Sequence, residues 1–226
     1  MHVQENFVDT DGIVPAHLAG EGAVFVGRLS REKGVDVLIR AWQQLPGGAH
    51  LHIAGDGPDR AELEQLAESI APGRVTFHGQ LDTAKVHDLV RSSAVFVAPS
   101  VWHENQPLAV LDALACGRPV VATKLGGMPE RITPGVDGDL VPAGDAGALA
   151  AAVGALVRNP ERAADMGEAA RAKAEQRFAP AAHAAAVERH YLSVMDGGRP
   201  RSAANAAPAD LDDPPTWPTG SPASAR

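Results

Sequence analysis

The sequence predicts an α/β fold in which helices pack on a parallel β-sheet, and three observations support this prediction. Short apolar stretches recur along the chain, glycine or polar turn residues follow them, and several of the next segments have the apolar spacing of an amphipathic helix. Strands that alternate with helices in this way form right-handed βαβ units, whose strands are parallel. The chain has 226 residues, 45% of them hydrophobic, which is enough for one sizeable core.

The first predicted unit begins with a strand over residues 23–28 that ends in a glycine turn. Val35, Leu38, Ile39 and Trp42 follow at the spacing i, i+3, i+4, i+7, which is the apolar stripe of a helix packed on a sheet. Helices also follow three of the later strands, the last of these helices over residues 107–115. The later strands are predicted at residues 50–54, 75–78, 95–98, 119–122 and 138–141.

The chain becomes helical after the sixth strand. Asp145 is expected to cap a helix over residues 146–158, and two more helices are expected over 161–178 and 180–195. The last thirty residues are rich in alanine, serine and proline and poor in large apolar side chains, which predicts disorder. The expected organisation is therefore an N-terminal segment (1–22), a ligand-binding domain with its C-terminal helices (23–195) and a disordered tail (196–226).

The composition excludes several classes of protein. A net charge of −8 argues against broad nucleic-acid binding, which requires clustered lysine and arginine, and 4% aromatic residues provide no evident base-stacking platform. No apolar run is long enough to cross a bilayer, and the N-terminus lacks the pattern of a signal peptide. The single cysteine, Cys116, excludes an internal disulfide and is expected to be buried and inert. We predict a cytoplasmic protein.

Ligands of open parallel sheets bind outside the carboxyl ends of the strands, so the segments that follow the strands are the candidate site. The turn after the first strand contains Gly27, Arg28 and Lys33. An arginine fork and a mobile lysine can together hold a pyrophosphate. The alternative is a solvated turn, and Arg31 of the same turn is expected to be a surface residue.

Two carboxylates, Glu104 and Asp112, lie eight positions apart across the start of the fourth predicted helix. Pro107 suits the first helical turn, so the amides of Asn105, Gln106 and Leu108 would lack intrahelical partners and favour a phosphate or sugar oxygen. The alternative role for Glu104 is interaction with the helix dipole, worth roughly 0.3–1 kcal/mol. The spacing of the two carboxylates suggests an elongated ligand such as a sugar nucleotide.

Several motifs together resemble the retaining glycosyltransferases of the GT-B fold that are usually numbered family four. The turn Val26-Gly-Arg28-Leu-Ser-Arg-Glu-Lys33-Gly34 is similar to the phosphate-binding loop of that family, and Glu104 to Asp112 is similar to its Glu-x7-Glu motif. The resemblance covers about residues 6–192. Supporting matches are Ile53-Ala-Gly-Asp-Gly57, Val75-Thr-Phe-His-Gly79, Gly117-Arg-Pro-Val-Val-Ala122 and Gly126-Gly-Met-Pro-Glu130.

The resemblance implies a donor site for a nucleoside diphosphate sugar and no metal or other cofactor. In such a site Arg28 and Lys33 contact the diphosphate, Gly55 and Gly57 allow a tight turn near the phosphates, and Glu104 contacts the donor sugar. The carboxylate of Asp112 takes the ribose hydroxyls, and the main chain of His78 and Gly79 holds the base. Gly126 and Gly127 form a flexible loop on the same rim, which Glu130 supports.

Three residues depart from the family pattern. Asp112 is one methylene shorter than the usual glutamate, so its reach to the ribose is in doubt. Asn105 and Gln106 replace the frequent Gly-Phe-Gly type loop, so their bulk is expected to narrow the sugar pocket.

The resemblance also implies a single Rossmann-like half of a GT-B enzyme, with helices on both faces of the sheet. Residues 6–11 resemble the crossover between the two halves, and we expect the acceptor half to come from a separate polypeptide or to be missing. Three functions remain open: the donor side of a glycosyltransferase, a nucleotide-sugar-binding module or remnant without activity, and another GT-B chemistry such as epimerisation.

Nine histidines raise the question of a metal site, which the sequence does not support. His50 and His52 share one strand face, but no acidic or cysteine partner has a ligand spacing. His103, beside Glu104, is expected to be a surface residue.

Overall fold

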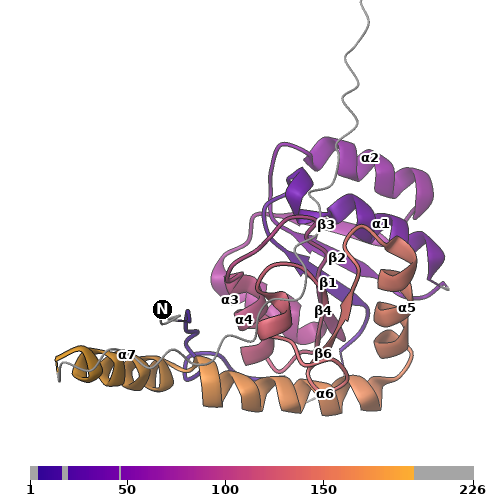
Figure 1. The fold of residues 1–226 in the computed structure, drawn as a ribbon. Coiled ribbons are helices and arrows are strands. Elements are labelled where there is room, and N and C mark those ends of the chain that lie inside the picture. Colours follow the sequence, from indigo (N-terminus) through magenta and orange to yellow (C-terminus); the bar gives the residue numbers. More distant parts are fainter. Residues whose placement is uncertain (1–4, 17–19, 46, 196–226) are drawn as a thin grey trace, which may run out of the picture.

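A computed structural model describes residues 5–16, 20–45 and 47–195, and its centre is one six-stranded parallel sheet (Figure 1). The strand order is β3-β2-β1-β4-β5-β6, and every pairing is parallel, as the sequence predicts. The strands are β1 (Ala23–Val26), β2 (Leu51–Ala54), β3 (Val75–Gly79), β4 (Val95–Ala98), β5 (Val120–Thr123) and β6 (Gly138–Val141).

Helices cover both faces of the sheet. One face carries α1 (Val35–Gln44), α2 (Arg60–Ile70) and α5 (Ala146–Val157), and the other carries α3 (Thr83–Ser92) and α4 (Leu108–Ala115). The apolar strands β4 and β5 are buried on both faces, which is typical of a parallel sheet. The α/β fold with helices on both faces is therefore confirmed.

The hydrophobic core consists of two layers that the sheet separates. Side chains alternate between these layers along each strand, so Phe25 of β1 packs with α1 and Val24 packs with α4. Trp42, at the last position of the predicted α1 stripe, is completely buried, and its indole Nε1 donates to the carbonyl of Ala49. The α1 stripe fixes the helix, and thus the loop before it, against the sheet.

The strand order reverses between β1 and β4. Because β2 and β3 lie on one side of β1 and β5 and β6 lie beyond β4, the connections leave this pair in opposite directions. Such a switch point leaves a crevice outside the carboxyl ends of the two strands. The loops that enter this crevice are residues 27–34 after β1 and residues 99–107 after β4.

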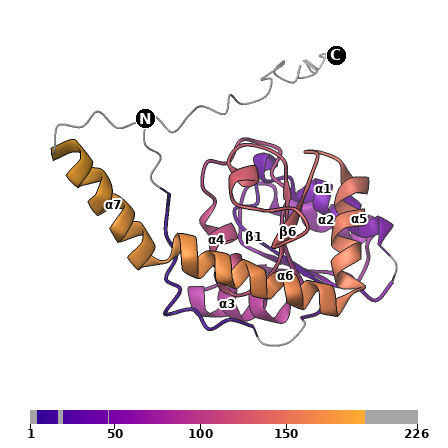
Figure 2. The same ribbon diagram turned by 60° about the horizontal axis from the view of Figure 1, so that its bottom comes forward.

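The N-terminal segment runs along the helices at the end of the chain. Arg171 of α6 (Pro160–Lys173) donates to the carbonyls of Thr10, Ile13 and Ala115, and the amide of Val8 donates to the carbonyl of Phe178. The last helix, α7 (Pro180–Met195), extends away from the sheet and buries none of its side chains completely (Figure 2).

Some predicted boundaries need correction. The single helix expected over 161–178 is α6 followed by a wider π-helical turn, Ala174–Phe178. Pro107 is the N-cap of α4 and not part of its first turn, so α4 begins at Leu108. Short 3-10 helices at Arg31–Lys33 and Met128–Glu130 were not predicted, because three residues carry no periodic pattern. The predicted disordered tail lies outside the described residues.

Candidate functional site

The loop after β1 is packed directly against the loop after β4. Gly34 adopts a left-handed conformation (φ 66°), and a Cβ there would lie 2.2 Å from the carbonyl oxygen of Pro99. The amide of Val101 donates to the carbonyl of Glu32 at 2.9 Å. Glycine at position 34 is therefore required for this close approach, which brings two segments that are distant in the sequence to one place.

Lys33 and Glu104 form an ion pair at this junction. The lysine Nζ lies 2.5 Å from the carboxylate Oε1, and the hydroxyl of Ser100 donates to the same oxygen at 3.1 Å. The side chains are 27% and 20% exposed, so both remain accessible to a ligand. Two of the side chains predicted for the donor site are thus in direct contact.

A cavity of about 310 Å³ lies at the carboxyl ends of β1 and β2. Arg28 and Gly27 line one wall, Gly55 and Asp56 line another, and Val86 of α3 closes a third. Gly55 has φ 135°, and a Cβ there would lie 1.9 Å from the carbonyl oxygen of Gly27. The predicted phosphate-loop residues Gly27, Arg28 and Gly55 are therefore brought together in one hollow.

The loop after β3 completes this region through its backbone. The carbonyl of Gly79 accepts from the amide of Gly55 at 2.7 Å, and Gln80 and Leu81 line the cavity. The side chain of His78 instead lies on the sheet face, where its Nε2 is 3.0 Å from Nδ1 of His52. His78 and Gly79 lie directly before these two lining residues, and a role of their main chain in holding a base stays a prediction.

The loop before α4 is held at several points. The amide of Gly127 donates to the carbonyl of Glu104 at 2.7 Å, so the predicted flexible loop of Gly126 and Gly127 is in fact tied to the site. The side-chain oxygen of Gln106 accepts from the amide of Asn6 at 2.5 Å, and Leu108 is 58% exposed. Asn105 and Gln106 lie in this loop, before the first turn of α4.

Asp112 lies further along α4, away from the ion pair. Its carboxylate Oδ1 is 4.0 Å from Nε2 of His87 on α3, and burial raises the pKa of this carboxyl group, while the neighbouring His87 lowers it to a smaller extent. His87 follows Val86, which lines the cavity. No described contact joins Asp112 to Arg28, Lys33 or Glu104.

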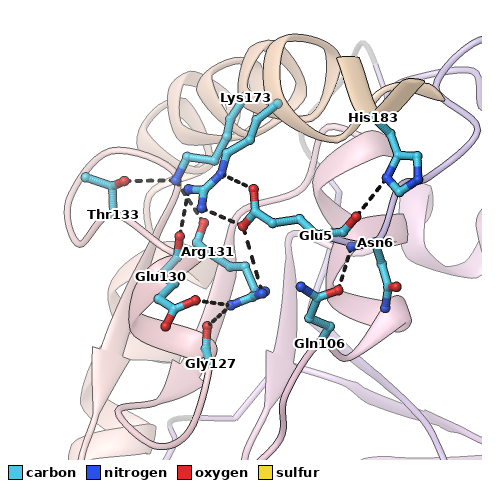
Figure 3. A network of polar contacts seen from close by, with 10 residues as sticks. Glu5, Asn6, Gln106, Gly127, Glu130, Arg131, Thr133, Lys173 and His183 are labelled. Carbon is cyan, nitrogen blue, oxygen red and sulfur yellow. Dashed lines mark hydrogen bonds and ion pairs between the residues drawn. The ribbon is translucent and has the colours of Figure 1, made fainter. Parts of the chain in front are cut away.

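Sequence reasoning did not identify Ser100 and Arg131 as site residues. Ser100 lies two positions after the end of β4, so its place on the rim was a usable signal. Arg131 is buried and contacts Gly127 and Glu130, so the support expected from Glu130 acts through this arginine (Figure 3). No local pattern in the sequence indicated that Arg131 is buried.

Neither a metal cluster nor a membrane-spanning helix was found in the described ranges. Within residues 5–16, 20–45 and 47–195, no three His, Cys, Asp or Glu side chains are arranged to hold a metal ion. In the same ranges, no helix combines the length and the apolar character needed to span a bilayer.

The model of the family "Glycosyl transferases group 1" matches residues 20–159, which contain β1 to β6 and most of the candidate site. Among curated relatives, the alpha-maltose-1-phosphate synthase of Mycolicibacterium smegmatis is 32% identical and aligns with 79% of this chain and 53% of its own length. A phosphatidyl-myo-inositol mannosyltransferase of Mycobacterium leprae is 34% identical, with coverages of 79% and 48%. The chain spans about half the length of these relatives.

Solved structures agree with this relationship. Sucrose-phosphate synthase from Thermosynechococcus elongatus superposes with a TM-score of 0.77 at 28% identity, over 87% of this chain and 53% of that one. Anabaena HepE in complex with UDP gives a TM-score of 0.72 at 28% identity, over 77% and 49%. Since the family model covers more than half of the sequence and the fold agrees, the chain belongs to the group 1 glycosyltransferases.

Proposed function

We propose that this chain binds the nucleoside diphosphate sugar donor of a retaining glycosyltransferase. The observation that carries the proposal is the Lys33–Glu104 ion pair at the switch point between β1 and β4, on the same edge of the sheet as the cavity that Arg28 lines. A cation that faces diphosphate and a carboxylate that faces sugar hydroxyls must lie within one ligand's length of each other. The ion pair satisfies this requirement.

The proposed binding mode assigns one part of the donor to each part of the site. The cavity of about 310 Å³ takes the nucleoside, with the Gly79–Leu81 backbone along one side. Arg28 and Lys33 take the diphosphate, and Glu104 takes a hydroxyl of the sugar. When the glycosidic bond to the donor breaks, negative charge grows on the departing diphosphate, and the two cations stabilise it.

The relatives support a sugar nucleotide as the ligand. The solved complexes of HepE contain UDP or UDP-glucose, and one curated relative from Mycolicibacterium smegmatis is named as a GDP-mannose-dependent mannosyltransferase. We propose that an acceptor hydroxyl receives the sugar with retention, that a separate polypeptide carries the acceptor site, and that the reaction takes place in the cytoplasm. In this proposal Arg28 and Lys33 neutralise the diphosphate in place of a metal ion.

Isothermal titration calorimetry with UDP, GDP and ADP tests donor binding. A hydrogen bond to a charged group contributes about 1.5–3 kcal/mol, so Arg28→Ala and Lys33→Ala should each weaken binding by about ten- to a hundredfold. EDTA should leave the wild-type Kd unchanged. Arg31→Ala, which removes an exposed cation from the same turn, is the matched control and should bind like the wild type. Identical heats for the wild type and both site variants would refute the proposal.

A second candidate function is nucleotide-sugar binding without transfer. Asp112 favours it, because its short carboxylate faces His87 and has no described contact with the ion pair. Release of free nucleoside diphosphate from a bound donor, measured by phosphorus NMR, separates the two functions. Slow hydrolysis that depends on Lys33 supports a transferase, whereas a donor that stays intact in the bound state supports a binding module.

A further inference from the structure

Arg131 is a buried cation at the centre of a polar network beside the candidate site (Figure 3). Only 2% of this residue is exposed, yet it lies directly after a 3-10 helix on the rim of the sheet. Burying a guanidinium is costly unless its donors are used. Its Nη1 donates to the carbonyl of Gly127 at 2.6 Å and to the carboxylate of Glu130 at 3.0 Å.

The contact with Gly127 leads directly to Glu104. The same peptide segment that accepts from Arg131 through the Gly127 carbonyl donates to the Glu104 carbonyl through the Gly127 amide. There is no room for a side chain here, because a Cβ on Gly127 would lie 2.2 Å from the carbonyl oxygen of Asn105 and 2.8 Å from Nη1 of Arg131. Arg131 and the backbone of Glu104 are therefore separated by one tightly packed residue.

The other side of Arg131 faces the N-terminal segment. Its Nη2 lies 3.9 Å from the carboxylate of Glu5, which also accepts two hydrogen bonds from Arg177, at 2.6 and 2.8 Å. His183 of α7 donates to the carbonyl of Glu5 at 2.8 Å. Figure 3 shows Glu5 between His183 and Arg131. The N-terminal segment is thereby fixed by residues from the C-terminal end of the domain.

A second contact joins the same segment to the site loop. The amide of Asn6 donates to the side chain of Gln106, two residues after Glu104. Residues 5 and 6 thus reach the loop of Glu104 by two routes, one through Gln106 and one through Arg131 and Gly127. Both routes end at the backbone that sets the position of the Glu104 carboxylate.

We propose that Arg131 is a positioning residue for recognition of the donor sugar, and that it couples the N-terminal segment at Glu5 to the carboxylate of Glu104. The inference rests on the proposed function, in which Glu104 contacts the sugar. Arg131 acts through Gly127 on Glu104 and has no described contact with Arg28 or Lys33, which hold the diphosphate. Loss of Arg131 should therefore weaken the contribution of the sugar and leave binding of the free nucleotide unchanged.

Calorimetry of paired ligands measures this contribution. The probes are UDP with UDP-glucose and GDP with GDP-mannose. For the pair that binds more tightly, the quantity compared is the Kd of the free nucleotide divided by the Kd of the sugar nucleotide. Glu104→Gln sets the full size of the loss, since it removes the carboxylate that faces the sugar. Arg131→Met should lower this ratio by about ten- to a hundredfold, as expected when one hydrogen bond to a charged group is lost, and leave the Kd of the free nucleotide unchanged.

Further variants separate a positioning role of Arg131 from an effect on folding. Arg131→Lys keeps the buried positive charge but lacks the forked guanidinium. It should therefore lower the ratio of Kd values as much as Arg131→Met does. Gly127→Ala disturbs the same link without removing a charge, and Gly47→Ala is its matched control, because a Cβ at position 47 meets no atom within 4 Å. Adding Arg131→Met to Glu104→Gln should cause no further loss, since the two residues act on one contact.

Amide hydrogen exchange of the ligand-free chain provides a readout that does not depend on nucleotide binding. Arg131→Met and Glu5→Gln should both increase exchange in residues 100–108 and leave exchange in β2 and α2 unchanged. Unchanged exchange in residues 100–108 would overturn the inference, as would a parallel rise of both Kd values. If the wild type binds no nucleotide but the exchange result holds, the donor function fails while the coupling between Glu5 and the Glu104 loop stands.

Discussion

Asp112 shows how one methylene group can decide how far a predicted ligand-binding side chain reaches. It occupies the position at which the resemblance places a ribose-binding glutamate, but its carboxylate lies 4.0 Å from Nε2 of His87 and has no described contact with the ion pair. The ion pair of Lys33 and Glu104, in contrast, has the short contact that a shared ligand site requires. The two carboxylates of the motif are therefore not equivalent in this chain.

Asp112→Glu is expected to tighten nucleoside diphosphate binding by about tenfold, because a longer side chain can reach past His87 to the ribose and a hydrogen bond to a charged group is worth about 1.5–3 kcal/mol. Calorimetry with the tightest-binding nucleotide measures the change. Asp88→Glu, which lengthens an exposed carboxylate on α3, is the control and should have no effect. Unchanged or weaker binding by Asp112→Glu would show that the shorter acid is already well placed.

At the residue scale, the sequence indicated which side chains lie on the rim but not which contacts they make. Lys33 and Glu104 each follow a predicted strand, so their common edge could be foreseen, whereas their direct pairing depends on the close approach of Gly34 to Pro99. Arg131 could not be foreseen at all. A buried arginine is defined by its partners, and one of these, Glu5, is 126 residues away in the sequence.

At the scale of elements, β2 and β3 carry a row of imidazoles on one sheet face. His50, His52 and His78 lie with ring centroids 4.9 and 5.2 Å apart, and Nε2 of His50 is 2.7 Å from the hydroxyl of Thr76. Burial and the neighbouring imidazoles lower the pKa of both His52 and His78. Their neutral forms are therefore favoured in the folded state.

This row predicts a loss of stability in acid. Below pH 6.5, the ordinary histidine pKa, these histidines bind more protons in the unfolded chain than in the folded chain. The free energy of unfolding therefore falls as the pH decreases toward the lowered pKa values of the folded state. Urea unfolding of His52→Thr at pH 7.5, 6.5 and 5.5 should give a shallower decline than the wild type. His103→Thr removes an exposed histidine and should keep the wild-type decline. Equal slopes in all three proteins would contradict this reasoning.

Element boundaries were predictable where the pattern was strong. The bounds of β4, β6 and α7 agree with the sequence prediction, and Asp145 caps α5 by accepting from the amide of Ala148. The start of α4 was displaced by one residue, because Pro107 is compatible with both the N-cap and the first turn. The π-helical turn after α6 leaves no separate signal in a continuous helical pattern.

At the scale of the whole molecule, the alternation of strands and helices predicted a parallel sheet but not the order of its strands. That order places β1 beside β4 and creates the switch point at which Arg28, Lys33 and Glu104 gather. Strand order depends on packing between distant segments, which short-range periodicity does not encode. The fold therefore joins two motifs that the sequence could only place on a common edge.

A second cavity allows a direct test of where the ligand binds. It has a volume of about 270 Å³ and lies near the amino end of β5, with Arg118 and Arg171 beside Glu168 and Glu175. It contains cations, like the cavity at the carboxyl ends of β1 and β2, but its two carboxylates oppose an anionic ligand. The two cavities lie at opposite ends of the sheet, so a structure of the complex shows without ambiguity which of them holds the diphosphate.

A crystal structure of the chain with UDP or GDP, whichever binds more tightly, is the most direct measurement. We predict diphosphate oxygens within hydrogen-bond distance, about 2.7–3.2 Å, of the Arg28 guanidinium and the Lys33 ammonium, with the base in the cavity beside Gly55 and Leu81. A nucleotide seated between Arg118 and Arg171, or one that leaves Arg28 and Lys33 without a phosphate contact, would contradict the assignment of the donor site.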